Sequence, residues 1–161
     1  MTRLKLAQLT LSLLIAATFM QAGASLFAIV VSVSTLVAAP PESLTIVQGA
    51  YGFNPDVFWN TFPNVHLAFV LLALIFCWKT HYRKWVFAGW AVGIMAGVVA
   101  IFLLSPVQSE FLTAQYSNSF DPALKEKGDL WLTYSVLFMS LSSLSGLVYI
   151  LGFIKAQPES Q

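Results

Sequence analysis

The first third of the chain contains a long stretch without charge, and this stretch restricts the fold more than any other feature. No Asp, Glu, Lys or Arg occurs from Leu6 to Ala39. As a helix, the stretch would be roughly 50 Å long, whereas the hydrocarbon core of a bilayer is about 30 Å thick. We therefore expect one long or tilted helix that crosses a membrane and projects beyond it.

A second interpretation of the same stretch is a cleaved signal peptide. Arg3 and Lys5 would form its positive region, Leu9–Met20 its apolar region and Ala22–Gly23–Ala24 its cleavage site. Cleavage would leave only Ser25–Ala39, which is too short to cross a bilayer comfortably. Span length favours the uncleaved helix, and both interpretations stay open at this point.

The composition points to the same class of protein. Charged residues make up 9% of the 161 residues, against roughly 25% in typical globular domains. Hydrophobic residues make up 58%, and the net charge is only +1. Such a chain has too few charges to cover a soluble surface, and it has no basic face for nucleic acid. The single cysteine, Cys77, excludes an internal disulfide and a multi-cysteine metal site.

Segment lengths predict an all-α fold, a bundle of four transmembrane helices in a single integral membrane domain, residues 1–161. Lipid-exposed spans must be helices or closed barrels, and the alternation of a barrel is absent. The expected helices cover about 6–39, 55–78, 85–105 and 130–154. The longer connections are then 40–54 and 106–129, and the short turn is 79–84.

Prolines and capping residues define most of these boundaries. Pro40 and Pro41 should end the first helix, and Pro106 the third, because proline offers no N–H. Asn54 and Pro55 have the sequence of an N-cap followed by the first helical residue.

Further signals lie inside the second helix and the second long connection. Pro63 predicts a kink near one end of the second helix. Asp121 and Pro122 predict the start of a short surface helix, and Gly128 its end. Asp129 would then cap the last span.

The distribution of Lys and Arg predicts the orientation. With four spans, both termini share a side with the turn 79–84. That side carries Arg3, Lys5, Lys79, Arg83, Lys84 and Lys155, and the other side only Lys125 and Lys127. The positive-inside rule therefore predicts cytoplasmic termini, in a plasma or inner membrane, with the longer loops facing outward.

Small residues recur every four positions in the third helix. Gly89, Gly93 and Gly97 form this stripe, which lets another helix approach closely. The stripe predicts tight packing inside the bundle, with a homodimer or another membrane subunit as the alternative occupant.

The histidine inside the second span is the main candidate site residue. His66 lies seven residues past Trp59 and so roughly 10 Å below the outer boundary. An ionisable group at this depth is costly and is a functional hypothesis by default. His66 could also be structural, bonding Gln21 or the Trp59 carbonyl that Pro63 leaves free. As a base, it would suit an acidic apolar substrate.

Other polar residues fall near the same depth. They predict a shallow polar pocket in the outer half of the bundle that binds a lipophilic small molecule, without a metal or other cofactor. The predicted pocket residues are Gln21, Ser25, Asn64, His66, Ser105 and Ser135.

The layout resembles the anthrone oxygenase-like family of small four-helix membrane proteins. The resemblance rests on Phe58–Trp59 opening the second helix, Trp78 closing it, a basic turn with Arg83 and Trp85, and Pro106. It implies a cofactor-independent oxygenase acting on a lipophilic substrate, with His66 as general base. Family members tend to follow the tryptophan of the last helix with a histidine and an arginine.

This chain departs from that last pattern, since Tyr134 and Ser135 follow Trp131. Two functions are therefore expected. The first is a small polytopic membrane protein without catalysis, a subunit or an apolar-ligand-binding bundle. The alternative is the oxygenase-like enzyme.

Overall fold

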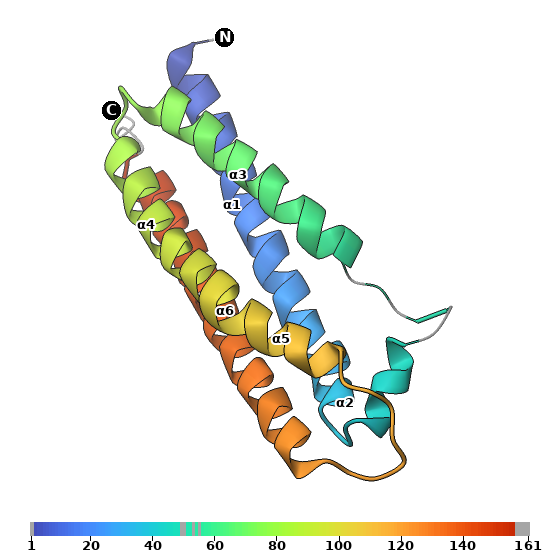
Figure 1. The fold of residues 1–161 in the computed structure, drawn as a ribbon. Coiled ribbons are helices and arrows are strands. Elements are labelled where there is room, and N and C mark those ends of the chain that lie inside the picture. Colours follow the sequence, from blue (N-terminus) through green and yellow to red (C-terminus); the bar gives the residue numbers. More distant parts are fainter. Residues whose placement is uncertain (1, 49–50, 53, 55, 157–161) are drawn as a thin grey trace.

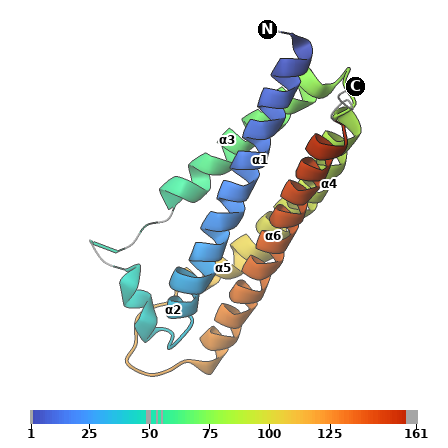
Figure 2. The same ribbon diagram turned by 180° about the vertical axis from the view of Figure 1, so that it is seen from behind.

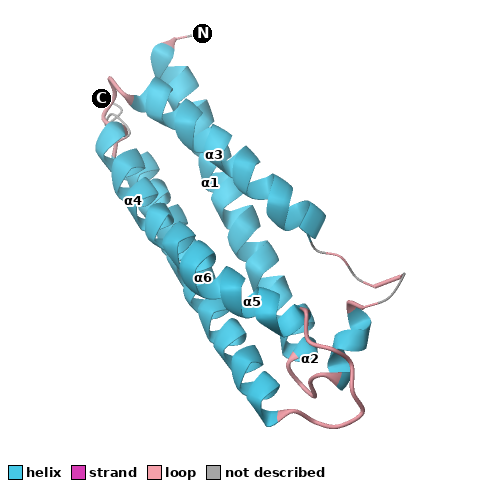
Figure 3. Cartoon of the chain, viewed as in Figure 1, coloured by secondary structure: helices cyan, strands magenta, loops and turns pink. Residues whose placement is uncertain are grey.

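The chain folds into helices joined by loops, with no strand in its described part (Figure 3). The computed structural model describes residues 2–48, 51–52, 54 and 56–156. The expected all-α class is confirmed for these residues. In chain order the elements are α1 (Arg3–Phe27), the π-helical segment η1 (Ala28–Val33), α2 (Ser34–Leu36), the 3₁₀ segment η2 (Glu42–Ile46), α3 (Asp56–Cys77), α4 (Arg83–Val99), the π-helical segment η3 (Ala100–Leu104), α5 (Ser105–Leu112) and α6 (Pro122–Lys155).

These elements form four long helical runs. Within the described residues, the runs Arg3–Leu36, Val57–Cys77, Arg83–Leu112 and Pro122–Lys155 are long and apolar enough to cross a membrane. The start of α1, the end of α6 and the turn between α3 and α4 lie at one end of the bundle, here called the termini end (Figure 1). The opposite end, called the loop end, carries the connections after α2 and after α5.

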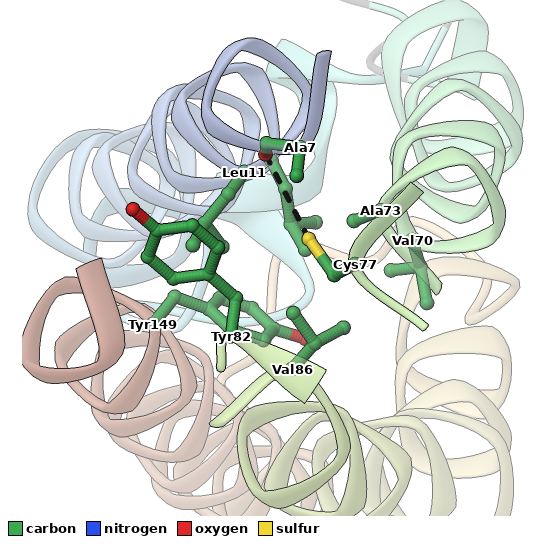
Figure 4. Close-up of a cluster of buried hydrophobic side chains, with 9 residues drawn as sticks. Ala7, Leu11, Val70, Ala73, Cys77, Tyr82, Val86 and Tyr149 are labelled. Atoms are coloured by element: carbon green, nitrogen blue, oxygen red, sulfur yellow. Dashed lines mark hydrogen bonds between the residues drawn. The ribbon is translucent and has the colours of Figure 1, made fainter. Parts of the chain in front are cut away.

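At the termini end, all four runs meet around one apolar core. Leu11 of α1, Val70 and Cys77 of α3, Val86 of α4 and Tyr149 of α6 are each at most 2% exposed (Figure 4). The Cys77 thiol also lies 3.7 Å from a backbone carbonyl of α1, that of Ala7. This core fixes the relative positions of the helices at the termini end.

The pair α4 and α6 packs most extensively in the bundle. Gly89 of α4 is buried so closely that an added Cβ would lie 2.3 Å from the Tyr149 ring of α6. The Ser145 hydroxyl of α6 donates a hydrogen bond of 2.7 Å to the Gly89 carbonyl. Part of the small-residue stripe therefore serves packing within the chain. At Gly97, by contrast, an added Cβ would meet nothing within 4 Å among the described residues.

The loop end has a second apolar core. Leu36 of α2, Leu44 of η2, Phe111 of α5 and Trp131 of α6 are buried in it. The Phe111 and Trp131 rings lie 5.4 Å apart. The two long loops are joined as well, since the Asp121 amide donates to the Pro40 carbonyl at 3.1 Å. Residues 40–46 and 111–121 thus take part in the packing of the loop end within the described part of the chain.

The predicted end of the third helix at Pro106 is wrong. The run continues from η3 into α5 and ends at Leu112, with Pro106 in the first turn of α5. Pro106 cannot supply an N–H to the carbonyl four residues earlier. The wider π-helical turn of η3 precedes it directly, and local π adjustments of this kind let apolar helices tolerate proline.

The predicted short surface helix ending at Gly128 is also wrong, because α6 is continuous from Pro122 to Lys155. The predicted cap at Asp121 is confirmed: its carboxylate accepts hydrogen bonds from the Ala123 and Leu124 amides at 2.9 and 3.1 Å. Gly128 lies inside the helix, where an added Cβ would lie 2.8 Å from the Phe111 ring. Gly128 is therefore needed for close packing and does not end the helix.

Helix α3 differs from the other long helices in its packing. It lies against α1 near the termini end and diverges from the bundle toward its Asp56 end (Figures 1 and 2). Pro63 lies inside it. The predicted start at Asn54–Pro55 includes Pro55, which lies outside the described residues; α3 is described from Asp56. The first turns of α3 line a cavity at the loop end.

Candidate functional site

A cavity of about 1130 Å³ occupies the space left by α3. Its wall combines the end of α1 with η1, Leu36 of α2, the first turns of α3, the α5 helix and one residue of α6, Trp131. The connection between α2 and α3 contributes Val47, Gly52 and Asn54. Pockets for small apolar ligands measure about 300–1,000 Å³, so this cavity is large enough for a lipid-sized molecule. The termini-end core cannot offer such space because all four runs are in contact there.

Aromatic side chains form much of this wall. The Phe58 ring stacks on the Phe62 ring at 5.1 Å and meets the Trp59 ring edge-on at 5.0 Å. Trp59 also packs against the buried side chains of Ala96, Val99 and Phe138, and so connects α3 to α4 and α6. The aromatic residues of the wall are Phe27, Phe58, Trp59, Phe62 and Trp131.

The polar groups of the wall come from several elements. Ser32 of η1, Thr61 of α3 and Gln108 of α5 line the cavity together with Asn54. Within the described part of the chain, none of the first three side chains forms a hydrogen bond with another residue. Their donors and acceptors are therefore available to a bound molecule.

The described wall of the cavity contains no charged side chain. The two lysines of the loop end are both ion-paired: Lys127 of α6 pairs with Glu110 of α5 at 2.6 Å, and Lys125 pairs with Asp129. These ion pairs are exposed, so they contribute at most about 1 kcal/mol each. The described part of the loop end therefore presents no unpaired lysine.

His66 does not line the cavity. Its Nε2 atom lies 2.9 Å from the Thr18 hydroxyl of α1, which itself donates to the Leu14 carbonyl at 2.7 Å. The predicted contact with Gln21 is replaced by Thr18, one helical turn closer to the termini end. Because Thr18 is 2% exposed, the His66–Thr18 pair is a polar contact between α1 and α3 inside the bundle.

The remaining predicted pocket residues are not brought together. The Ser25 hydroxyl donates to the Gln21 carbonyl and the Ser135 hydroxyl to the Trp131 carbonyl, each within its own helix. Asn64 is exposed and donates to the Asn60 carbonyl, and Ser105 is exposed as well.

None of the six predicted pocket residues is part of the cavity wall. Counting residues along a helix predicts how deep each side chain lies in the membrane. It does not predict the face of the helix on which the side chain lies. The cavity residues carried a weaker signal, namely the aromatic cluster at Phe58, Trp59 and Phe62 near the start of the second helix.

No group of three His, Cys, Asp or Glu side chains within the described residues is arranged to hold a metal ion. No family model matches the chain, and searches of curated proteins and of solved structures also gave no match. The resemblance to the anthrone oxygenase-like family therefore stays a prediction, and function has to be argued from the cavity.

Proposed function

We propose that the chain is an integral membrane protein with cytoplasmic termini whose loop-end cavity binds an apolar ligand. The protein would act by holding this ligand, as a binding bundle or as the ligand-binding subunit of a membrane complex. The observation that carries the proposal is the large aromatic cavity in an otherwise packed bundle of four apolar helices.

Exposed apolar side chains support membrane insertion. Ile94, Met95 and Val98 of α4 are 49–57% exposed, and Leu147 and Leu151 of α6 are 51% and 44% exposed. In water, contiguous apolar faces of this extent would promote aggregation. In a bilayer these side chains would face lipid chains, and their exposure would carry no free-energy penalty.

Charges and tryptophans at the termini end support the orientation. Arg83 lies 5.7 Å above the Trp78 ring, and Lys84 and Lys155 each lie 5.8 Å from the Trp85 ring. Tryptophan beside basic residues is typical of a cytoplasmic membrane boundary. The loop end instead carries the acidic residues Glu42, Asp56, Glu110, Asp121, Glu126 and Asp129.

Single introduced cysteines test this orientation in intact cells. His81→Cys places a thiol at the exposed turn of the termini end, and Gln115→Cys places one in the exposed loop at the other end. The native Cys77 is fully buried and gives little background. A membrane-impermeant maleimide should label only Gln115→Cys; labelling of His81→Cys alone would reverse the proposed orientation.

A photoreactive hydrocarbon tests ligand binding in lipid nanodiscs. Labelling of cavity residues should saturate and be displaced by an unlabelled analogue, whereas labelling of lipid-facing α4 residues should rise linearly. Ala28→Phe places a bulky side chain in the wall of the cavity, reduces the space for a ligand and should abolish the saturable component. Ala68→Phe, at an exposed position of α3 outside the wall, is the matched control. Linear labelling at every site would refute the proposal.

The oxygenase alternative gains no comparable support. A general base must lie within hydrogen-bonding reach of the substrate atom, and His66 lies outside the cavity wall with its Nε2 beside Thr18.

A further inference from the structure

We infer that the cavity selects an uncharged amphiphile, a lipid-like molecule whose head carries a hydroxyl or carbonyl group, over anionic amphiphiles with the same chain. This inference rests on the proposed ligand binding and names the chemical class of the ligand. Four observations carry it: the unpaired polar groups of the wall, the excess of carboxylates over lysines at the loop end, the ion-paired lysines and the aromatic surface.

The unpaired polar groups supply both donors and acceptors. Hydroxyls on helices commonly donate to a carbonyl of the preceding turn, as Ser25 and Ser34 do on either side of the cavity-lining Ser32. Ser32 and Thr61 form no such bond among the described residues, and the Gln108 amide is also unpaired. A hydroxyl or carbonyl head could bond these groups, whereas a pure hydrocarbon could not.

An anionic head finds no partner at this site. The sequence has no Lys or Arg between residues 6 and 78, and between residues 86 and 154 it has only Lys125 and Lys127. Both lysines are paired with carboxylates. Carboxylates also outnumber lysines at the loop end. A carboxylate or phosphate head would therefore be desolvated without a cation and beside like charges.

The aromatic side chains of the wall complete the match to a neutral molecule. These side chains are Phe27, Phe58, Trp59, Phe62 and Trp131. They provide apolar surface for the body of the ligand.

The test uses two photoreactive probes with one and the same sixteen-carbon chain, an alcohol and a carboxylate. The intact protein is placed in phosphatidylcholine nanodiscs, and labelled cavity peptides are quantified against probe mole fraction. The alcohol should reach half-saturation at least about tenfold below the carboxylate, which corresponds to about 1.4 kcal/mol of selectivity.

Two variants remove the inferred contacts while keeping side-chain size similar. Gln108→Leu and Thr61→Val should each weaken alcohol binding about three- to tenfold, in line with the net value of about 0.5–1.5 kcal/mol for one hydrogen bond. Asn60→Leu and Thr133→Val alter exposed residues of α3 and α6 outside the wall, and they should change nothing. The two substitutions lie in different helices, α5 and α3. If one variant misfolds, the other still tests the inference.

Each outcome separates the inference from the proposed function. Saturable labelling with equal affinity for both heads, or with preference for the carboxylate, would overturn the inference and leave ligand binding standing. Unchanged alcohol binding in both Gln108→Leu and Thr61→Val would overturn it as well. No saturable labelling by any probe would refute the proposed function itself.

Discussion

The glycine stripe of α4 gives a prediction in which three chemically identical substitutions should have different effects. Gly89, Gly93 and Gly97 lie one helical turn apart, and each can be changed to alanine. The space around them differs sharply. An added Cβ would lie 2.3 Å from a Tyr149 ring carbon at Gly89 and 3.6 Å from the Ser145 hydroxyl at Gly93, with nothing within 4 Å at Gly97 among the described residues.

The expected magnitudes follow from these distances. At Gly89 the Tyr149 ring would have to move, and that ring is 1% exposed and packed in the termini-end core. Overpacking of this kind costs about 1–3 kcal/mol. At Gly93 the contact is an ordinary one, and at Gly97 there is none. Both of these substitutions should stay within about 0.5 kcal/mol of the wild type, or stabilise slightly because alanine favours helix.

The assay is reversible unfolding in mixed micelles, followed by tryptophan fluorescence, with the free energy of unfolding compared across the three variants. Gly89→Ala should be clearly destabilised and the other two should not. Equal destabilisation by Gly97→Ala would show that the far half of the stripe packs against something outside this chain. Loss of a dimer in the Gly97→Ala variant would identify that occupant as a second copy, the alternative that the sequence leaves open.

Three further predictions concern polar contacts and the cysteine. Ser145→Ala removes the hydrogen bond to α4 and should lower the free energy of unfolding by about 0.6–1.5 kcal/mol, whereas Ser140→Ala, whose hydroxyl bonds its own helix, should have no measurable effect. A double-mutant cycle with Thr18→Val and His66→Leu should give a coupling of about 0.6 kcal/mol and at most about 1.7 kcal/mol, the average and the maximum for polar pairs between helices in membranes. Additive effects would mean that the two side chains do not interact in the folded protein. Cys77 should resist maleimide in the native protein, since it is fully buried, and should react on unfolding; rapid native labelling would contradict the termini-end core.

The helix boundaries show where local sequence rules stop being sufficient. Asp121 behaves as its sequence predicts, because an N-cap depends only on the next few amides. Pro106 and Gly128 do not, because their effect depends on surroundings outside the local segment. The helix continues through Pro106 after a π-helical turn, and Gly128 sits where Phe111 approaches closely.

The candidate site shows the same contrast between what a local segment predicts and what its tertiary surroundings decide. The depth of His66 follows from counting residues along a helix, but its partner depends on how α1 and α3 are rotated toward each other. The structure brings Thr18 to His66 and leaves Asn64 and Ser105 on exposed faces. When a helix is apolar on all sides, its sequence has little periodicity to say which face is buried.

The sequence by itself determined the class of element, the number of apolar runs and the unequal distribution of charge between the two ends. These properties depend on length and composition, which are local to each segment. Only the tertiary structure decided where the chain is packed and where it is open. Four helices meet around Leu11 and Tyr149 at one end, and α3 leaves the bundle at the other. The cavity exists because of that divergence, which is a relation between helices that no single segment encodes.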